Sequence, residues 1–347
     1  MFEITAEDLD RILADFGAGG RAVAFSELQR YHYERRDPNS REVRLIVKVE
    51  TEQAGAVVVR FKREEDVTLV LLEEQSTFAS LLERRGIETP AQYRAGGRFA
   101  RWYTIGGYDV MVTVEKFVEG QLSCVDVATA QETGALLGRM HNIAREEDCH
   151  VRGRVLFDPL GENDLFDFGE FQAKRKNLEA LEPGLYQDIV ATAQEYLGIL
   201  SEFDAEGHWA VQGDISDCNM YRTADGRLGV FDFNRSGDNN LYFDAVMQGV
   251  FEARLMDYPQ EYGENSEEII LPAFLEGYHQ ERPFTQRQRE VYPYLYALIH
   301  AFWSMDLKWR EDSLANAVER DEEAAQRAWL EEIHRRLHTL PAMPLPV

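Results

Sequence analysis

The sequence has little of what several classes of protein require. Three cysteines in 347 residues, without the paired spacing of zinc ligands, exclude a disulfide-rich or zinc-ribbon scaffold. Only 37 lysines and arginines stand against 62 aspartates and glutamates, a net charge of −25, which argues against a nucleic-acid partner. No apolar run approaches the length of a membrane span, and the first residues lack a signal-peptide pattern. We therefore expect no membrane partner and a reduced, cytoplasmic compartment.

The excess of acidic charge lies in the later part of the chain. Residues 1–115 carry 16 basic and 20 acidic side chains, whereas residues 116–347 carry 21 and 42. This asymmetry has two interpretations: a pocket that attracts cationic substrates, or a solvated acidic surface that keeps the protein soluble. The sequence carries no signal for an oligomeric state.

The most informative stretch covers residues 208–244. It consists of an apolar strand, a loop with Asp214 and Asn219, a turn at 224–226, and a second strand that leads to Asp232. Two strands joined by a short turn bring their ends together, so these three side chains are expected to converge.

Such a cluster suits phosphoryl transfer, in which the protein positions a nucleophile and holds divalent cations against phosphates. Asp214 fits the base that accepts the proton of the attacking hydroxyl, and Asn219 and Asp232 fit oxygen ligands for Mg²⁺. The spacing D-x-x-x-x-N alone is weak, because Asp and Asn are common in turns. A D-F-N sequence that begins 18 residues after Asp214 makes the pattern more specific.

This stretch resembles the catalytic segment of the aminoglycoside phosphotransferase and choline kinase superfamily, which includes homoserine-kinase-type enzymes. The family's H-G-D-x-x-x-x-N appears as Q-G-D-I-S-D-C-N at residues 212–219, so Gln212 replaces the family histidine. The family's D-F-G or D-F-D appears as D-F-N at 232–234, and Asp244 matches the acidic residue that follows. The resemblance extends over about residues 20–310.

The resemblance implies an α+β, bilobal protein-kinase-like fold. Residues 1–115 are expected to form a nucleotide-binding lobe with an antiparallel sheet and a helix, and residues 116–347 a larger, mainly helical catalytic and substrate-binding lobe. The residue patterns agree with this: a capped helix at the N-terminus is followed by strand-like runs, and an amphipathic helix is predicted over 178–200.

The resemblance also implies a nucleotide site. Arg60, in V-V-V-R-F, matches the family's phosphate-binding cation, with Lys62 as the rival, and Glu74 on the following helix matches its acidic partner. The alternative is that Arg60 and Glu74 are both ordinary surface charges. Residues 115–117 resemble the interlobe hinge, where Glu115 and Phe117 would read the adenine through their backbone groups.

The turn at 37–40 falls where kinase-like folds cover the ATP phosphates. It lacks the G-x-G-x-x-G of protein kinases, so Asn39 and Ser40 are the candidate phosphate donors, and an ordinary surface turn is the alternative.

Two histidine positions have their own interpretations. His141 is expected to be a hydrogen-bonded core residue. His334 and His338 have the i, i+4 spacing of a metal pair, but their charged helix favours a solvated face.

Together these features predict an ATP- and Mg²⁺-dependent O-phosphotransferase, with GTP as the alternative nucleotide. The substrate is expected to be a small hydroxylated molecule such as an amino alcohol, a homoserine-like metabolite or an aminoglycoside. A catalytically inactive binding or structural module and a protein Ser/Thr kinase are the alternatives. Candidates for the acceptor pocket in the later helices are Glu252, Asp257, His300, Trp303 and Asp306.

Overall fold

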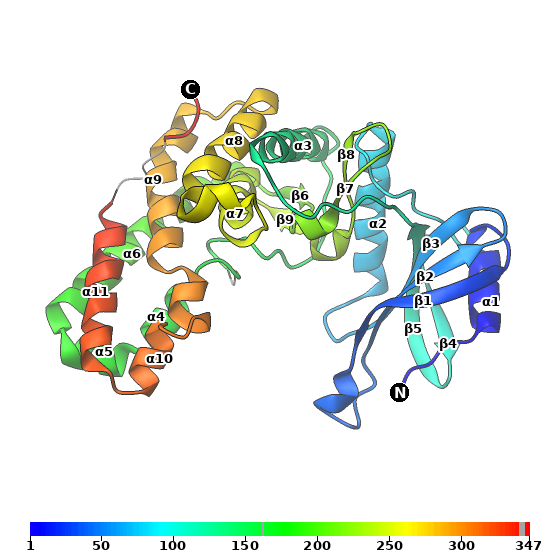
Figure 1. Ribbon diagram of the computed structural model, residues 1–347, viewed down its shortest axis with the longest axis horizontal. Helices are drawn as coiled ribbons and strands as arrows, with labels where there is room; N and C mark the ends of the chain where they lie inside the picture. The colour runs from blue at the N-terminus through cyan, green and yellow to red at the C-terminus, as the bar shows by residue number, and fades with distance from the viewer. Residues whose placement is uncertain (162, 340–343) are drawn as a thin grey trace. The chain divides into compact units, whose positions relative to one another are not determined.

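The computed structural model describes residues 1–161, 163–339 and 344–347 (Figure 1). The chain forms two compact units and passes between them repeatedly. The sheet unit comprises Met1–Ser123, Ile143–Gly153 and Ile215–Gly237, and the helical unit comprises Cys124–Asn142, Arg154–Asp214 and Asp238–Val347. The predicted lobe boundary at 115/116 stays a prediction; two later segments are counted with the first unit.

The sheet unit is built on a five-stranded antiparallel sheet in the order β1-β2-β3-β5-β4. Its strands and helices have the following bounds: α1 Ala6–Phe16, β1 Ala22–Tyr31, the 3-10 turn η1 Tyr33–Arg35, β2 Val43–Thr51, β3 Gly55–Arg63, α2 Leu69–Arg84, β4 Ala100–Ile105 and β5 Tyr108–Lys116.

The alternation of β3 separates two faces of this sheet. Val57, Val59 and Phe61 are fully buried in the core that α1 covers. The residues between them face the other way, because successive strand side chains point to opposite faces. This places Arg60 and Lys62 together on the face away from α1.

The predicted N-terminal helix is confirmed. Thr5 accepts a hydrogen bond from the Asp8 N–H, and the Asp8 carboxylate accepts one from the Thr5 N–H, which completes a capping box. Gly17 ends the helix with a φ of 63°, a left-handed conformation that glycine adopts without strain.

A short hairpin completes the sheet unit. It consists of the 3-10 turn η3 Asp217–Asn219, β7 Met220–Arg222, β8 Leu228–Val230 and the 3-10 turn η4 Phe233–Arg235. The Val230 N–H donates to the Glu88 carbonyl at 2.9 Å, and the Arg222 N–H donates to the Gly120 carbonyl at 2.9 Å. These bonds fix the hairpin against the segments that flank β4 and β5.

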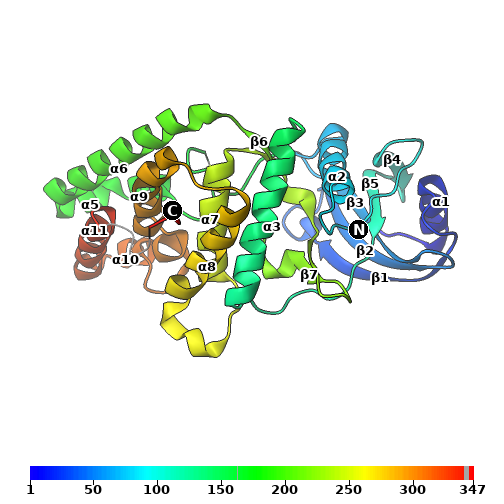
Figure 2. The same ribbon diagram turned by 90° about the horizontal axis from the view of Figure 1, so that it is seen from above.

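Helices make up most of the helical unit (Figure 2). Their bounds are α3 Val127–Glu146, with its last turn counted in the sheet unit, α4 Phe168–Ala173, α5 Arg175–Leu181, α6 Pro183–Phe203, α7 Leu241–Leu255, α8 Ser266–Glu281, α9 Gln286–Ala301, α10 Leu314–Glu319 and α11 Glu323–Leu337. Shorter elements are the 3-10 turns η2 Asp204–Glu206 and η5 Gln260–Asn265, the π-helical turn η6 Met305–Trp309, and the strands β6 Trp209–Val211 and β9 Gly237–Asn239.

The single helix predicted over 178–200 is wrong at its start. The chain forms α5 and then α6, and Pro183 occupies the first turn of α6. Proline lacks an N–H and clashes with the preceding turn, so it begins a helix rather than continuing one. Among the described residues, no helix combines the length and the apolar character that a bilayer crossing requires.

Helices α3 and α8 lie side by side in the helical unit (Figure 2) and approach closely at two glycines. A Cβ atom added to Gly134 would lie 1.9 Å from the Phe274 carbonyl oxygen, and one added to Gly277 would lie 1.9 Å from the Gln131 carbonyl oxygen. Both partners are backbone atoms, so neither can rotate away. The crossing therefore requires glycine at both positions.

We predict that Gly134→Ala lowers the free energy of unfolding by about 3 kcal/mol or more, because the two helices must separate to admit the methyl group. The control is Gly198→Ala in α6, where an added Cβ meets nothing within 4 Å. That variant should gain about 1 kcal/mol from helix propensity. Urea denaturation measures both, and equal effects would contradict the close crossing.

Candidate functional site

Arg60 is held by an ion pair within the sheet. Its guanidinium donates to Glu115 Oε1 from Nη2 at 2.8 Å and from Nε at 3.1 Å. Glu115 lies on the adjacent strand β5, opposite Val58, so the β3–β5 register brings the two side chains together. The other Glu115 oxygen accepts from the Gln92 amide at 2.9 Å. Both members of the pair are buried.

The remaining arm of the Arg60 guanidinium points to Asp232. Nη1 lies 3.5 Å from Asp232 Oδ2 and has no hydrogen-bond partner among the described residues. Burial lowers the pKa of Arg60, but the attraction of Asp232 and Glu115 outweighs it and raises that pKa. Arg60 is therefore a fixed positive charge.

Lys62 lies two residues further along the same face of β3. Its ammonium group donates to the Asn234 side-chain oxygen, and only 5% of the residue is exposed. Burial and, next, the neighbouring Arg60 lower the pKa of Lys62 from 10.5 to about 8.

The hairpin places Asp232 and Asn219 next to each other along the ladder. The Phe231 N–H, one residue before Asp232, donates to the Asn219 carbonyl at 2.9 Å. Asp232 has a φ of 57°, a left-handed conformation that aspartate tolerates better than most residues. Burial raises the pKa of Asp232, but Arg60 and Lys62 more than offset this and hold that pKa below its usual range. The carboxylate therefore stays ionised.

The sheet unit has a cavity of about 700 Å³ that these residues line, except Lys62. Of the residues predicted from the sequence, Arg60, Glu115, Phe117, Asn219 and Asp232 line it. The lining also includes residues that the sequence did not single out: Leu28, Gln29, Ile46, Lys48, Val58, Pro90, Val118 and Phe231. A cavity of this volume with an apolar wall and a few charged groups is typical of small-molecule sites.

Glu74 has a different partner from the one expected. It accepts three hydrogen bonds from Arg152, from the backbone N–H at 2.9 Å, from Nε at 2.7 Å and from Nη2, so the predicted Arg60–Glu74 pair is wrong. The reason is the rotational position of residue 74 on α2, which does not put Glu74 on the buried face of the helix. Gln75, one residue later, occupies the buried face of α2 and donates to the Asn234 and Ser236 carbonyls at 3.0 and 3.3 Å.

Asn39 and Ser40 form a turn closed by Asp37. The Asp37 carboxylate accepts from the Asn39 N–H at 2.9 Å, and its carbonyl accepts from the Ser40 N–H at 2.9 Å. Neither residue is among those that line the 700 Å³ cavity. From β1, the lining residues are Leu28 and Gln29, beside an irregularity in the β1–β2 register. The role of Asn39 and Ser40 toward phosphate stays a prediction.

The hinge-like segment keeps only part of its backbone for a ligand. The Phe117 N–H donates to the Ala56 carbonyl at 3.0 Å, and the Lys116 N–H donates to the Ala91 carbonyl at 2.9 Å. A base reading by Phe117 would therefore use its carbonyl rather than its N–H.

Asp214 is the last residue of a segment of the helical unit, directly before the hairpin segment begins. Gln212 is fully buried, and its side-chain oxygen accepts from the Asp214 N–H at 2.7 Å. Gly213, between them, has a φ of 85°. Gln212, which replaces the family histidine, thus braces the loop through its side chain.

His141 is a core residue, as predicted. It is 1% exposed, its Nδ1 lies 3.0 Å from the Tyr278 hydroxyl, and its Nε2 lies 3.1 Å from Asp244 Oδ2. Burial lowers the pKa of His141 despite the carboxylate beside it.

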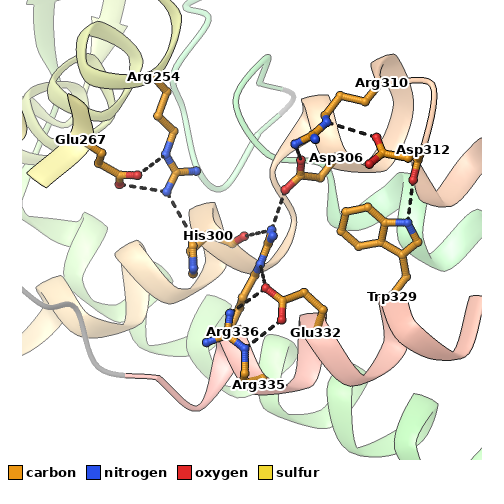
Figure 3. Close-up of polar contacts among 10 residues, drawn as sticks. All are labelled: Arg254, Glu267, His300, Asp306, Arg310, Asp312, Trp329, Glu332, Arg335 and Arg336. Atoms are coloured by element: carbon orange, nitrogen blue, oxygen red, sulfur yellow. Dashed lines mark hydrogen bonds and ion pairs between the residues drawn. The ribbon is translucent and has the colours of Figure 1, made fainter. Parts of the chain in front are cut away.

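His300 and Asp306, two of the predicted acceptor residues, belong to a charged cluster in the helical unit (Figure 3). The other members of this cluster are Arg254, Glu267, Arg310, Glu332 and Arg336. Arg254 forms a bidentate pair with Glu267 at 2.9 Å and 2.9 Å and donates to His300 Nδ1 at 3.2 Å. The Arg254 guanidinium also lies 4.6 Å from the centre of the Trp303 ring. Burial and Arg254 lower the pKa of His300 to about 4, so this imidazole is neutral near pH 7.

Asp306 is likewise neutralised by arginines (Figure 3). Its carboxylate accepts from Arg336 Nη1 at 2.6 Å and from Arg310 Nη1 at 3.2 Å. Glu252 is 1% exposed within α7, and the Asp257 carbonyl accepts from the Val125 N–H at 2.7 Å. The structure thus gives structural contacts to most of these candidates, and their role toward an acceptor stays a prediction.

Comparison with known proteins identifies the family of the chain. The model of the phosphotransferase enzyme family matches residues 38–286, which include Arg60, Asp214 and Asp232. The chain belongs to this phosphotransferase family. It is therefore a phosphotransferase, and its α+β architecture is the kinase-like one expected from the sequence.

Solved structures show the same fold at low identity. An amicoumacin kinase in complex with AMP-PNP and Ca²⁺ is 17% identical over 84% of this chain and 86% of that chain, with a TM-score of 0.52. The microcompartment-associated aminopropanol kinase is 13% identical over 94% of this chain and 100% of that chain, with a TM-score of 0.54. No curated protein matches the chain.

The burial of Lys62 in this phosphotransferase predicts a pH-dependent stability. Between pH 8 and 10.5 the folded chain has lost the Lys62 proton while the unfolded chain still binds it, so this residue makes stability rise with pH by up to about 1.4 kcal/mol per unit. Lys62→Met should therefore be more stable relative to wild type at pH 7 than at pH 10.5. Urea denaturation from pH 7 to 10.5 measures the difference.

The matched control for that series is Lys116→Met, which removes an exposed lysine of the same sheet. Its stability should run parallel to that of wild type. A Lys62→Met curve parallel to wild type would show that Lys62 does not titrate in this range.

Proposed function

We propose that the protein is an ATP- and Mg²⁺-dependent O-phosphotransferase that acts on a small, hydroxylated, amine-bearing molecule. One observation supports this most: a single cavity is lined by a fixed guanidinium, an ionised carboxylate and an asparagine, in a chain that belongs to the phosphotransferase family. Groups of these kinds bind a nucleoside triphosphate together with its metal ion.

The donor set fits a hard divalent cation. Asn219 offers an amide oxygen and Asp232 an ionised carboxylate, and Mg²⁺ prefers such oxygen ligands together with phosphate oxygens. When bound, the cation would neutralise charge on the phosphates. The amicoumacin kinase of similar fold was solved with Ca²⁺ and AMP-PNP, which agrees with a nucleotide and a divalent cation here.

Arg60 is suited to hold the nucleotide phosphates. Its Nε and Nη2 bind Glu115, and its Nη1 makes no hydrogen bond to the described residues, which leaves a donor for a phosphate oxygen. Arg60 is one of the residues that line the cavity. A guanidinium fixed in this way loses little side-chain entropy on binding.

Asp214 is the proposed base. The acceptor hydroxyl oxygen forms a bond to the γ-phosphorus while the bond from that phosphorus to the ADP oxygen breaks, and the hydroxyl proton passes to the Asp214 carboxylate. Gln212 orients this loop through the Asp214 N–H.

The amine on the acceptor is supported by the long-range field. The net charge of −25, concentrated after residue 115, raises the local concentration of cationic molecules. The aminopropanol kinase that shares the fold is named for an amino alcohol, which belongs to the acceptor class that we propose.

We predict that Asp214→Asn reduces phosphate transfer to amino alcohols at least about 100-fold, because the amide cannot accept the proton. ATP binding in the presence of Mg²⁺ should remain near that of wild type, since Asp214 is not assigned to the nucleotide. Transfer is measured by coupled ADP release and binding by thermal shift. Wild-type turnover in Asp214→Asn would remove this residue from the mechanism.

The partner of Arg60 yields a separate prediction. Glu115→Gln should raise the KM for ATP roughly tenfold, because a charged hydrogen bond of about 1.5–3 kcal/mol that positions Arg60 is weakened. Glu74→Gln, which removes one charge from the Arg152 contact at the edge of α2, is the control and should leave that KM nearly unchanged. The reverse ranking would restore Glu74 as the functional partner.

A thermal shift of the full chain with ATP or GTP, each with and without Mg²⁺, tests the proposal as a whole. Ligand that binds the native state raises the Tm by mass action. A Mg²⁺-dependent rise with ATP supports the nucleotide site. No rise with either nucleotide at millimolar concentration would favour a binding module with the kinase-like fold.

A further inference from the structure

A cluster of two imidazoles and a carboxylate lies outside the proposed catalytic machinery. His334 and His338 lie at i and i+4 at the C-terminal end of α11, so they share one face of that helix. Asp188 of α6 faces them, although it is 146 residues before His334 in the sequence. Ligand atoms of these three residues all lie within 4.8 Å of one another.

We propose that Asp188, His334 and His338 form a binding site for a divalent transition metal of the zinc type. Two imidazoles and one carboxylate are a three-ligand set that such ions accept, with a fourth position left for water. The chemistry excludes Mg²⁺ as the preferred ion, because magnesium favours oxygen ligands alone.

The distances between the three ligand atoms fit this chemistry. His334 Nε2 lies 2.9 Å from Asp188 Oδ2, and His338 Nε2 lies 3.5 Å from the same oxygen. Ligands at about 2.0–2.1 Å from zinc would be separated by roughly 2.9 Å at a right angle and roughly 3.4 Å at a tetrahedral angle. The two separations in the structure cover this range. The imidazole rings lie with their centres 4.5 Å apart and are tilted by 60° to each other.

The two helices are held at this spacing by contacts other than the cluster itself. The Tyr196 hydroxyl of α6 donates to the Leu337 carbonyl of α11 at 3.1 Å. Leu330, Ile333 and Leu337 are the buried apolar residues of α11. Packing therefore brings the ligands together, and this lowers the entropic cost of binding a metal.

The charges beside the cluster do not oppose a cation. Arg335 and Arg336, which follow His334 directly, are both bound to Glu332 (Figure 3). Arg336 is also committed to Asp306. Asp188, His334 and His338 are 55%, 38% and 45% exposed, so an ion reaches them from solvent.

A direct hydrogen bond from His334 to Asp188 would account for the shorter distance without any metal. It would not require His338, whose Nε2 is 3.5 Å away, to point at the same oxygen. The two interpretations differ in what happens when either histidine is removed, and the site does not depend on the proposed transfer activity.

The test is zinc binding to the full chain, with any affinity tag removed, by isothermal titration calorimetry. Wild type should bind one Zn²⁺ that is absent from His334→Ala, from His338→Ala and from Asp188→Asn, or held at least about tenfold more weakly in each. The Tm of wild type should rise with ZnCl₂ but not with MgCl₂ through this site.

His208→Ala is the matched control. His208, like His334, pairs with an aspartate: its Nε2 lies 2.7 Å from Asp204 Oδ1. This pair contains one imidazole, whereas the proposed zinc site contains two. This variant should bind zinc as wild type does. Circular dichroism of each variant shows whether the fold is kept, and the Co²⁺ absorption spectrum of wild type gives an independent readout of nitrogen ligation.

Two results would overturn the proposal. One is a wild-type chain that shows no zinc binding at 100-fold excess of metal over protein. The other is zinc binding that persists with unchanged affinity in both histidine variants, which would assign the ion to other residues.

Discussion

The buried guanidinium of Arg60 is the constraint on which the site depends. Moving a charge out of water costs several kcal/mol unless partners surround it, and Arg60 has Glu115 on one side and Asp232 on the other. The same charge keeps Asp232 ionised and lowers the pKa of Lys62. A neutral residue at position 60 would therefore change the protonation of its neighbours.

The choice of Glu115 as partner has a structural consequence. Arg60 and Glu115 stand on adjacent strands of one sheet, so the register of β3 and β5 fixes the cation. In the family pattern that cation is paired by a residue on the following helix, and its position would then depend on where that helix lies. Here α2 is fastened separately, through Gln75, to the backbone that follows Asp232. The position of the Arg60 charge thus depends on the sheet and on Asp232 of the hairpin, rather than on a side chain of α2.

The sequence predicts the elements of this fold better than their contacts. Local signals identified α1, because its capping box and terminal glycine act within one turn, and identified the strands, because their apolar alternation has period two. The pairing of Arg60 was missed because the β3–β5 register and the phase of α2 are set by tertiary packing. Glu115 was chosen for its backbone, and no local pattern shows where its side chain points. Pro183 carried a signal for the break between α5 and α6 that the apolar spacing concealed.

In the helical unit, long-range attraction of a cationic acceptor and its recognition by particular side chains have to be considered separately. Glu267, which shares Arg254 with His300, and Asp306, itself a predicted acceptor residue, are each already bound by arginine. An acceptor amine that sought either carboxylate would have to displace a guanidinium with several hydrogen bonds, which costs more than a single ammonium contact returns. In the proposed function, the surplus of acid would act on an amine through its long-range field. Recognition of the acceptor must rely on groups outside these arginine pairs, and the neutral His300 beside Arg254 is a hydrogen-bonding group rather than a charge in that setting.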